Sequence, residues 1–187
     1  MTSAPAWTRI LEAHEKGECF RGRAVRRSLG RTDGAFHGYF IDIEGARAFL
    51  PASKAAWFYN PERDACGKFL ALTLEAIYPN GPKAGNITVN AYAPLKHVLS
   101  SQNSRAFQPN ATPWALAMDH DAKSLIFPHF NNKVIRVPLH EASALAQRKG
   151  IGGGDCGSLT GRFWQLRVQT WKPGGICVAH PVDIMTE

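Results

Sequence analysis

The stretch Gly38–Ser53, GYFIDIEGARAFLPAS, decides how the first half of the chain folds. From Tyr39 to Ile43, large apolar residues at odd positions alternate with Phe40 and Asp42, and this period of two predicts a half-buried strand. A Glu-Gly pair then supplies a tight turn, and the chain returns as a second strand that ends at a proline. Because a phenylalanine on the polar face of such a hairpin needs a reason, Phe40 is the first candidate binding residue.

Further strands are expected on both sides of this hairpin. Residues 17–30 alternate between small or apolar residues and arginines, which predicts a strand with Arg21, Arg23, Val25 and Arg27 on its outer face. Two more strands are expected within 68–93, separated by a Pro-Asn-Gly turn, and a short helix is expected over 6–16, starting near Thr8. Five short strands are typical of a small closed Greek-key barrel of the oligonucleotide/oligosaccharide-binding (OB) kind.

The second half repeats this order of elements. Residues 94–112 are rich in Ser, Asn, Gln and Pro without periodicity and predict a linker. Beyond it we expect five strands and one short helix, with the strands at 114–119, 123–130, 133–139, 162–171 and 175–182 and the helix at 140–150. Setting Gly67 on Gly161 aligns the following strands at a constant offset of 94 positions. The chain is therefore predicted to be mainly β, with an OB-like barrel and its N-terminal helix at 1–93 and a second, degenerate barrel at 113–187.

Composition narrows the class of protein. Hydrophobic residues make up 44% of the 187 residues, an ordinary value for a globular protein, and no apolar run approaches the roughly 18 residues needed to cross a bilayer. No basic segment followed by an apolar core stands at the N-terminus, so a cytoplasmic protein without membrane partners is expected. The net charge of +7 permits a nucleic-acid partner without establishing one.

Several motifs in the first half belong to a known pattern. They are GECFRGRAV at 17–25, the aromatic-aliphatic-acidic strand FIDI at 40–43, the strand ending FLPAS at 49–53, and the Gly-Lys pair before the fourth strand. Together they make residues 16–93 resemble the RNA-binding repeat of ribosomal protein S-one, whereas the second half carries only fragments of the pattern. The resemblance implies an OB-fold that binds single-stranded nucleic acid, RNA before DNA, through aromatic rings on the second and third strands and basic side chains nearby.

Two kinds of side chain are expected at this interface. By the resemblance, Phe40 holds the principal aromatic position of the family. Phe36 has the same parity as Phe40, so the two rings project from one face if the strand begins early enough. Stacking a base on such a ring contributes roughly 1–3 kcal/mol. Phe49 stays open between a surface and a core role, because a bulge is common in this strand. The phosphate contacts are expected from five cations, namely Arg21, Arg23, Arg27, Lys54 and Lys83.

Departures from the family pattern favour a second hypothesis. Many members of the family carry His at the place of Pro51, an acidic residue at that of Asn80 and a basic residue at that of Asn86. The loss of these polar positions fits a protein-interaction module, an adaptor or inhibitor built on a degenerate barrel. Its partner would be a protein or a ribonucleoprotein, since a fold alone does not determine function.

No constellation in the sequence supports an enzyme, a metal site or a cofactor. The Gly152–Gly154 run lacks both the Walker signature and a strand-to-helix setting, so a flexible connection is expected. The histidines and aspartates at 119–140 have no compact ligand spacing, and no base can be assigned to Cys156. The four scattered cysteines are interpreted as small apolar residues. Trp164 and Trp171 have opposite parity, so one is expected in the core and the other nearer the surface.

Overall fold

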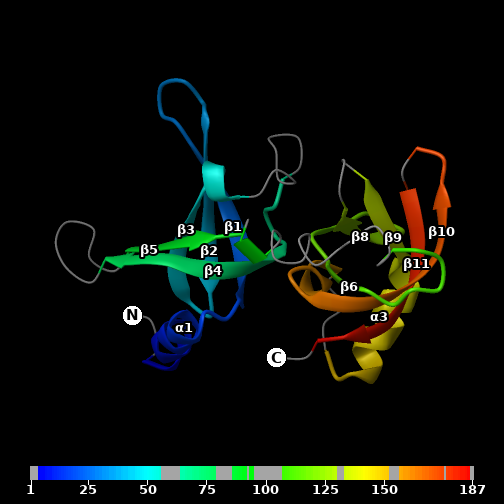
Figure 1. Ribbon diagram of the computed structural model, residues 1–187. Helices are drawn as coiled ribbons and strands as arrows, with labels where there is room; N and C mark the ends of the chain where they lie inside the picture. The colour runs from blue at the N-terminus through cyan, green and yellow to red at the C-terminus, as the bar shows by residue number, and fades with distance from the viewer. Residues whose placement is uncertain are drawn as a thin grey trace. The chain divides into compact units, whose positions relative to one another are not determined.

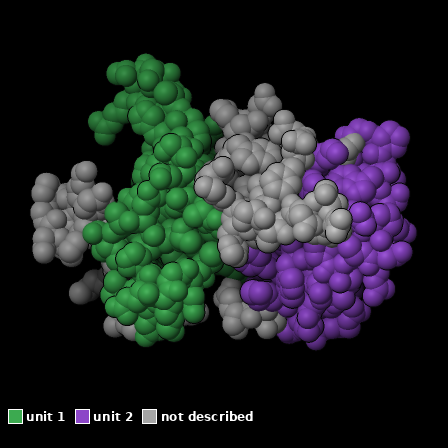
Figure 2. Space-filling view, in the orientation of Figure 1, with its two compact units in different colours: residues 1–95 green, residues 96–187 purple. Residues whose placement is uncertain are grey.

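The computed structural model (Figure 1) describes residues 4–55, 64–78, 86–91, 93–94, 107–129, 133–151, 156–174 and 176–185. The chain divides into two compact units, residues 1–95 and residues 96–187 (Figure 2). Each unit has its own β-sheet and its own group of buried apolar side chains. The mainly-β class expected from the sequence is therefore confirmed.

Unit 1 is a closed barrel of five strands in the order β1-β2-β3-β5-β4 (Figure 1). All neighbours in this barrel are antiparallel except β3 and β5, which run parallel. Helix α1 contacts β4 and begins before the expected Thr8. The elements are α1 (Ala4–Lys16), β1 (Phe20–Leu29), β2 (Phe36–Ile43), β3 (Ala46–Pro51), the 3-10 turn η1 (Ala52–Lys54), β4 (Phe69–Tyr78) and β5 (Asn86–Asn90).

The hairpin formed by β2 and β3 has the expected alternation and turn. Tyr39, Ile41 and Ile43 are buried inside the barrel, as their shared parity predicts. Glu44 and Gly45 both have positive φ, 51° and 88°, which is the pattern of a tight two-residue hairpin turn. The turn matches the right-handed twist of the strands, so local chemistry and barrel packing favour the same hairpin.

Unit 2 is a six-stranded sheet in the order β6-β10-β11-β9-β8-β7. Helix α3 contacts β8, β9 and β11 of this sheet. The helix falls close to the span expected from its sequence. The elements are β6 (Trp114–Leu116), β7 (Asp119–His120), β8 (Ser124–Pro128), β9 (Val134–Pro138), α3 (Leu139–Arg148), the 3-10 turn η2 (Cys156–Leu159), β10 (Phe163–Lys172) and β11 (Ile176–Ile184).

The prediction of five strands in the second half needs a correction. The single strand expected over 114–119 is divided, because the chain changes its hydrogen-bonding partner in the middle. The N–H of Ala117 donates to the carbonyl of Arg162 beside β10, whereas the N–H of Met118 donates to Ile126 in β8. The two end strands of the sheet, β6 and β7, therefore belong to one short stretch of chain.

The buried core of unit 2 extends into the segment expected to be a linker. Phe107 is only 3% exposed within this core, and the N–H of Asn110 donates to the carbonyl of Val168 at 2.9 Å. Residues 107–112 therefore belong structurally to unit 2, and residues 95–106 lie outside the described residues. Trp164 is fully buried while Trp171 is half-buried and donates from Nε1 to the carbonyl of Phe107 at 2.9 Å, which confirms their predicted difference.

The two units pair their strands in the same register. In each unit one alanine donates its N–H to a basic residue and accepts the N–H of the preceding glycine, Ala24 with Lys68 and Gly67 in unit 1 and Ala117 with Arg162 and Gly161 in unit 2. The register shift between positions 74 and 76 of β4 recurs between 168 and 170 of β10. The parallel pair of Ala48 with Ile87 likewise corresponds to that of Ile135 with Cys177. The offset of 94 positions found in the sequence thus holds for the glycine pair and for this irregularity.

Candidate functional site

An aromatic pair occupies the outer face of the β2–β3 hairpin. Phe40 and Phe49 lie directly opposite each other across the two strands, with ring centroids 5.7 Å apart and an interplanar angle of 55°. Both side chains are half-buried, so part of each ring faces solvent. The role of Phe49, which the sequence left open, is therefore on the surface beside Phe40. We call these two residues the aromatic pair.

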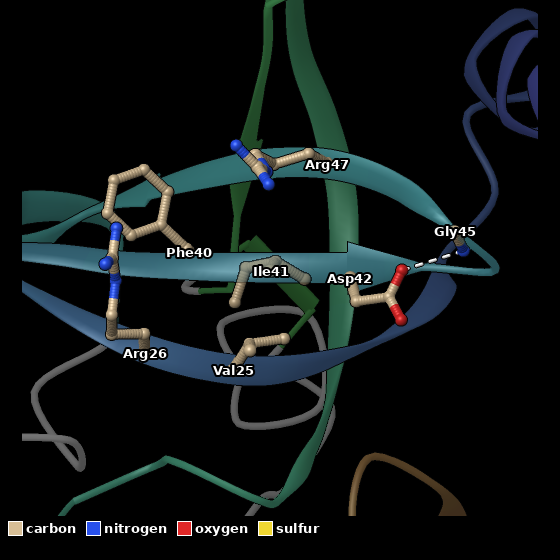
Figure 3. A pocket seen from close by; sticks show the side chains of 7 residues that line it. All are labelled: Val25, Arg26, Phe40, Ile41, Asp42, Gly45 and Arg47. Carbon is tan, nitrogen blue, oxygen red and sulfur yellow. Dashed lines mark hydrogen bonds between the residues drawn. The ribbon is translucent and has the colours of Figure 1, made fainter. Parts of the chain in front are cut away.

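Arg26 is the cation beside the aromatic pair. Its guanidinium carbon lies 4.8 Å from the centroid of the Phe40 ring, within the range of a cation–π contact (Figure 3). A bulge at Val25 shifts the pairing of β1 with β2, so that Arg26 faces Phe40 and Arg27 faces Tyr39. The alternation of β1 therefore predicted the outer face correctly as far as Val25, which is 58% exposed, but wrongly beyond it, and it missed Arg26.

Phe36 is separated from the aromatic pair, contrary to the expectation that the two predicted rings share a face. Its ring meets that of buried Tyr39 edge-on at 5.0 Å, and the guanidinium of Arg27 lies 5.1 Å from its centroid. A second register shift falls between Ser28 and Leu29, where β1 pairs with the start of β2. On β2 itself, Gly38 has a φ of 144°, which changes the phase of the side chains.

A row of charged side chains crosses the barrel next to the aromatic pair. Arg23 on β1, Asp42 on β2 and Arg47 on β3 are neighbours in the pairing register, and all three are exposed. Arg26, Asp42 and Arg47 line a hollow of about 590 Å³ beside Phe40 (Figure 3). The surface thus combines apolar rings with an excess of positive charge.

The remaining predicted cations lie elsewhere or are partly neutralised. The guanidinium of Arg21 lies 4.5 Å from the ring centroid of Phe69 on β4, so it belongs to the β1–β4 face. Lys54 forms an ion pair with Glu75 at 2.7 Å, which offsets its charge. Lys83 lies outside the described residues. Of the four predicted cations that the structure describes, Arg23 alone is in the row beside the aromatic pair.

Unit 2 has different chemistry at the positions that correspond to the aromatic pair. Two residues beyond the shared alanine, Arg26 faces Phe40 in unit 1, whereas Asp119 faces Ile126 in unit 2. Ile126 is 5% exposed and pairs on its other side with Arg136, at the place of Phe49. No ring therefore stands at either of these two positions in unit 2.

Arg136 of unit 2 is instead held by Asp121, and this ion pair is expected to affect stability in acid. Burial raises the pKa of Asp121, but N–H groups of Lys123 and Ser124 and the guanidinium of Arg136 outweigh it and hold the pKa below its usual value of 3.8. A lowered pKa in the folded state stabilises the fold above the unfolded pKa, and this contribution is lost as the pH falls through the folded value.

Asp121→Asn is therefore expected to lower the thermal stability of the protein at neutral pH, by less than about 1 kcal/mol because the pair is half-exposed. The asparagine Oδ1 still accepts the two N–H groups that Asp121 Oδ1 accepts, so the variant removes mainly the charge. Melting temperatures of both proteins should converge in acid, below the folded pKa of Asp121. A deficit that persists unchanged in acid would contradict a charge effect.

The interpretation of the cysteines as small apolar residues fits one of them. Cys177 is buried in the core of unit 2, and burial raises the pKa of its thiol to about 11. Cys66 and Cys156 are half-buried, and Cys19 is exposed. In the part of the chain that the structure describes, no helix is long and apolar enough to span a membrane.

Comparisons with known proteins give little beyond this geometry. No protein-family model matches the sequence, and no curated protein matches it at a significant level. One similar solved structure is a multidomain protein with nucleic acid binding domains from Streptococcus pneumoniae TIGR4, with a TM-score of 0.35 and 13% sequence identity. The match covers 91% of this chain and 53% of that protein, so the chain spans about half the length of this structural neighbour.

Proposed function

We propose that unit 1 is an OB-type barrel that binds single-stranded RNA on the outer face of β2 and β3. Its strand order, β1-β2-β3-β5-β4, is that of a five-stranded Greek-key barrel, whose second and third strands form the usual ligand face. The resemblance of residues 16–93 to the repeat of ribosomal protein S-one points in the same direction. The observation that carries the proposal is the aromatic pair, half-exposed on that face and accompanied by arginines.

The aromatic pair is better suited to bind the unpaired bases of a single strand than a duplex. Every base has a π-face, and a ring that is partly open to solvent offers a stacking surface worth roughly 1–3 kcal/mol per base. In a duplex the bases are already stacked on one another, so only an unpaired strand presents their faces. Phe40 and Phe49 are thus expected to prefer single strands to double-stranded nucleic acid.

The exposed arginines around the aromatic pair supply a path for the phosphates. Arg23 and Arg47 flank it in the neighbouring row, and Arg26 lies against Phe40 itself. Guanidinium groups bind phosphate oxygens and also stack on bases, so Arg26 serves either purpose. Asp42 offsets part of this charge, which leaves a moderately basic site.

Unit 2 is, in this proposal, a degenerate second copy of the same barrel that has lost the RNA face. The shared pairing register and the recurring irregularity of β4 and β10 support a duplication. Ile126 and Arg136 then stand where the aromatic pair would be, and Asp121 engages the arginine. RNA binding is therefore assigned to unit 1.

A salt titration with three labelled ligands tests the proposal: single-stranded RNA, single-stranded DNA of the same sequence, and duplex. With Arg23, Arg26 and Arg47 at phosphates, the logarithm of the binding constant should fall against the logarithm of salt concentration with a slope of about −2. Single strands should bind more tightly than the duplex, and RNA more tightly than DNA. Equal affinity for RNA and DNA would remove the preference for RNA. Negligible binding of all three ligands would contradict the proposal and favour the protein-interaction module.

A further inference from the structure

Asp42 is an acidic side chain in the middle of the basic row. It faces Arg23 on one side and Arg47 on the other, yet among the described residues it forms an ion pair with neither. Its Oδ1 accepts the N–H of Gly45 at 2.7 Å, which fixes the orientation of the carboxylate at the hairpin turn. In the described part of the chain no hydrogen bond engages Oδ2, so this oxygen remains available to a ligand.

Asp42 stands at the right distance from the stacking position to contact a base. Phe40 and Asp42 are two residues apart on one strand and face the same side, so about 7 Å separates them along β2. Both line the hollow beside the aromatic pair, with Arg47 across from them (Figure 3). The Asp42 carboxylate is turned toward Gly45 and away from the Phe40 ring (Figure 3), so it meets the edge of a base that lies over Phe40 and extends along β2.

We propose that Asp42 selects guanine at the base position on Phe40, an inference that rests on the proposed function. A carboxylate only accepts hydrogen bonds, so it favours an edge that carries donors. Guanine presents two adjacent donors on its Watson–Crick edge, N1–H and the N2 amino group. Adenine and cytosine present one amino group there. Uracil presents N3–H between two carbonyl oxygens, which the carboxylate repels, so the expected order is guanine, then adenine and cytosine, then uracil.

Asp42 also has a local role at the turn, and the variant must separate the two roles. Asp42→Asn retains an Oδ1 that accepts the Gly45 N–H, so the turn is preserved. The variant replaces the free acceptor by an amide donor, which suits the carbonyl oxygens of uracil. A purely structural role would change all affinities by the same factor, whereas base selection reverses their order.

The experiment compares single-stranded RNAs of about 12 nucleotides, within the usual site size of such a barrel. One is all uridine, and the others carry guanine, adenine or cytosine at regular intervals in the same uridine background. Fluorescence anisotropy at one salt concentration measures their affinities for the protein. The wild type should bind the guanine RNA about tenfold more tightly than the all-uridine RNA. Asp42→Asn should abolish or invert this ratio and should bind the all-uridine RNA more tightly than the wild type does.

Asp33→Asn provides the matched control. Asp33 is another exposed aspartate whose Oδ1 accepts a turn N–H, that of Ala35 at 3.0 Å, and it lies in the loop between β1 and β2 and does not line the hollow beside Phe40. This variant removes the same charge and should keep the guanine preference. Equal affinities of the wild type for all four RNAs would overturn base selection, and so would an equal change of all four affinities in Asp42→Asn. In either case the proposed function still stands if RNA binding depends on Phe40. Failure of every RNA to bind would overturn both.

Discussion

Replacing Phe40 and Phe49 together with alanine is expected to lower the affinity for single-stranded RNA by about a hundredfold or more, because each ring stacks one base. Each single substitution should cost about tenfold. A hundredfold loss is the product of the two single losses, and because the rings touch, with centroids 5.7 Å apart, the difference from that product measures their coupling. Loss of Phe40 also frees the guanidinium of Arg26 from its ring contact. Anisotropy titrations of the two single variants and the double variant measure these effects.

Two further variants test whether the loss of RNA affinity is caused by the loss of stacking. Trp114→Ala removes an aromatic side chain that is 39% exposed on unit 2, and it should leave RNA affinity unchanged. Leucine at positions 40 and 49 keeps apolar bulk but has no π-face, so it should bind nearly as weakly as alanine. Thermal unfolding must show that the double variant stays folded. A folded double variant with wild-type affinity would rule out the aromatic pair as the binding surface.

The β2–β3 hairpin was predictable from the sequence because the residues that determine it are close together in the chain. Alternation places Tyr39 and Ile41 inside, and a Glu-Gly pair with positive φ makes the turn. Phe40 on the outer face follows from the same parity. Its partner Phe49 required the cross-strand register, which the length of the turn fixes once the hairpin is accepted.

Arg26 was missed because a bulge belongs to a pair of strands and not to one strand. Strict alternation points Arg26 into the barrel, where an unpaired charge would be costly. That cost is the signal that the sequence held, because it favours an irregular strand that turns Arg26 outward. The bulge at Val25 is that irregularity, and it reassigns the outer face to Arg26.

The division of the strand expected at 114–119 has a similar origin. The backbone of Ala117 bonds toward β10 and that of Met118 toward β8, so the break depends on partners far away in the sequence. The misplaced Phe36 follows the same rule, because the second register shift of β1 and the φ of Gly38 move it to the side of Tyr39. The alternation within one strand therefore predicts which side chains face the core only as far as the nearest bulge or register shift.

Gly38→Ala is expected to destabilise unit 1 by about 3 kcal/mol, because no side chain fits at this position. A Cβ on Gly38 would lie 2.1 Å from the carbonyl oxygen of Leu50, an atom of the β3 backbone that cannot swing away. Its φ of 144° is also unfavourable for any residue with a Cβ. The strands must separate to admit the methyl group, at the end of the hairpin two residues from Phe40. Urea unfolding followed by circular dichroism measures the loss.

Gly34→Ala separates the steric cost at Gly38 from the cost of backbone conformation. Gly34 has a φ of 64°, and a Cβ there would meet no atom within 4 Å, so only the left-handed conformation opposes alanine, at about 1–2 kcal/mol. The Gly38 variant should therefore be clearly less stable than the Gly34 variant. It should also bind RNA more weakly under conditions where it remains folded, since the opening of β2 from β3 displaces Phe40 from Phe49. Equal stability of the two variants would mean that β3 yields to the methyl group and that Gly38 does not hold the aromatic pair in register.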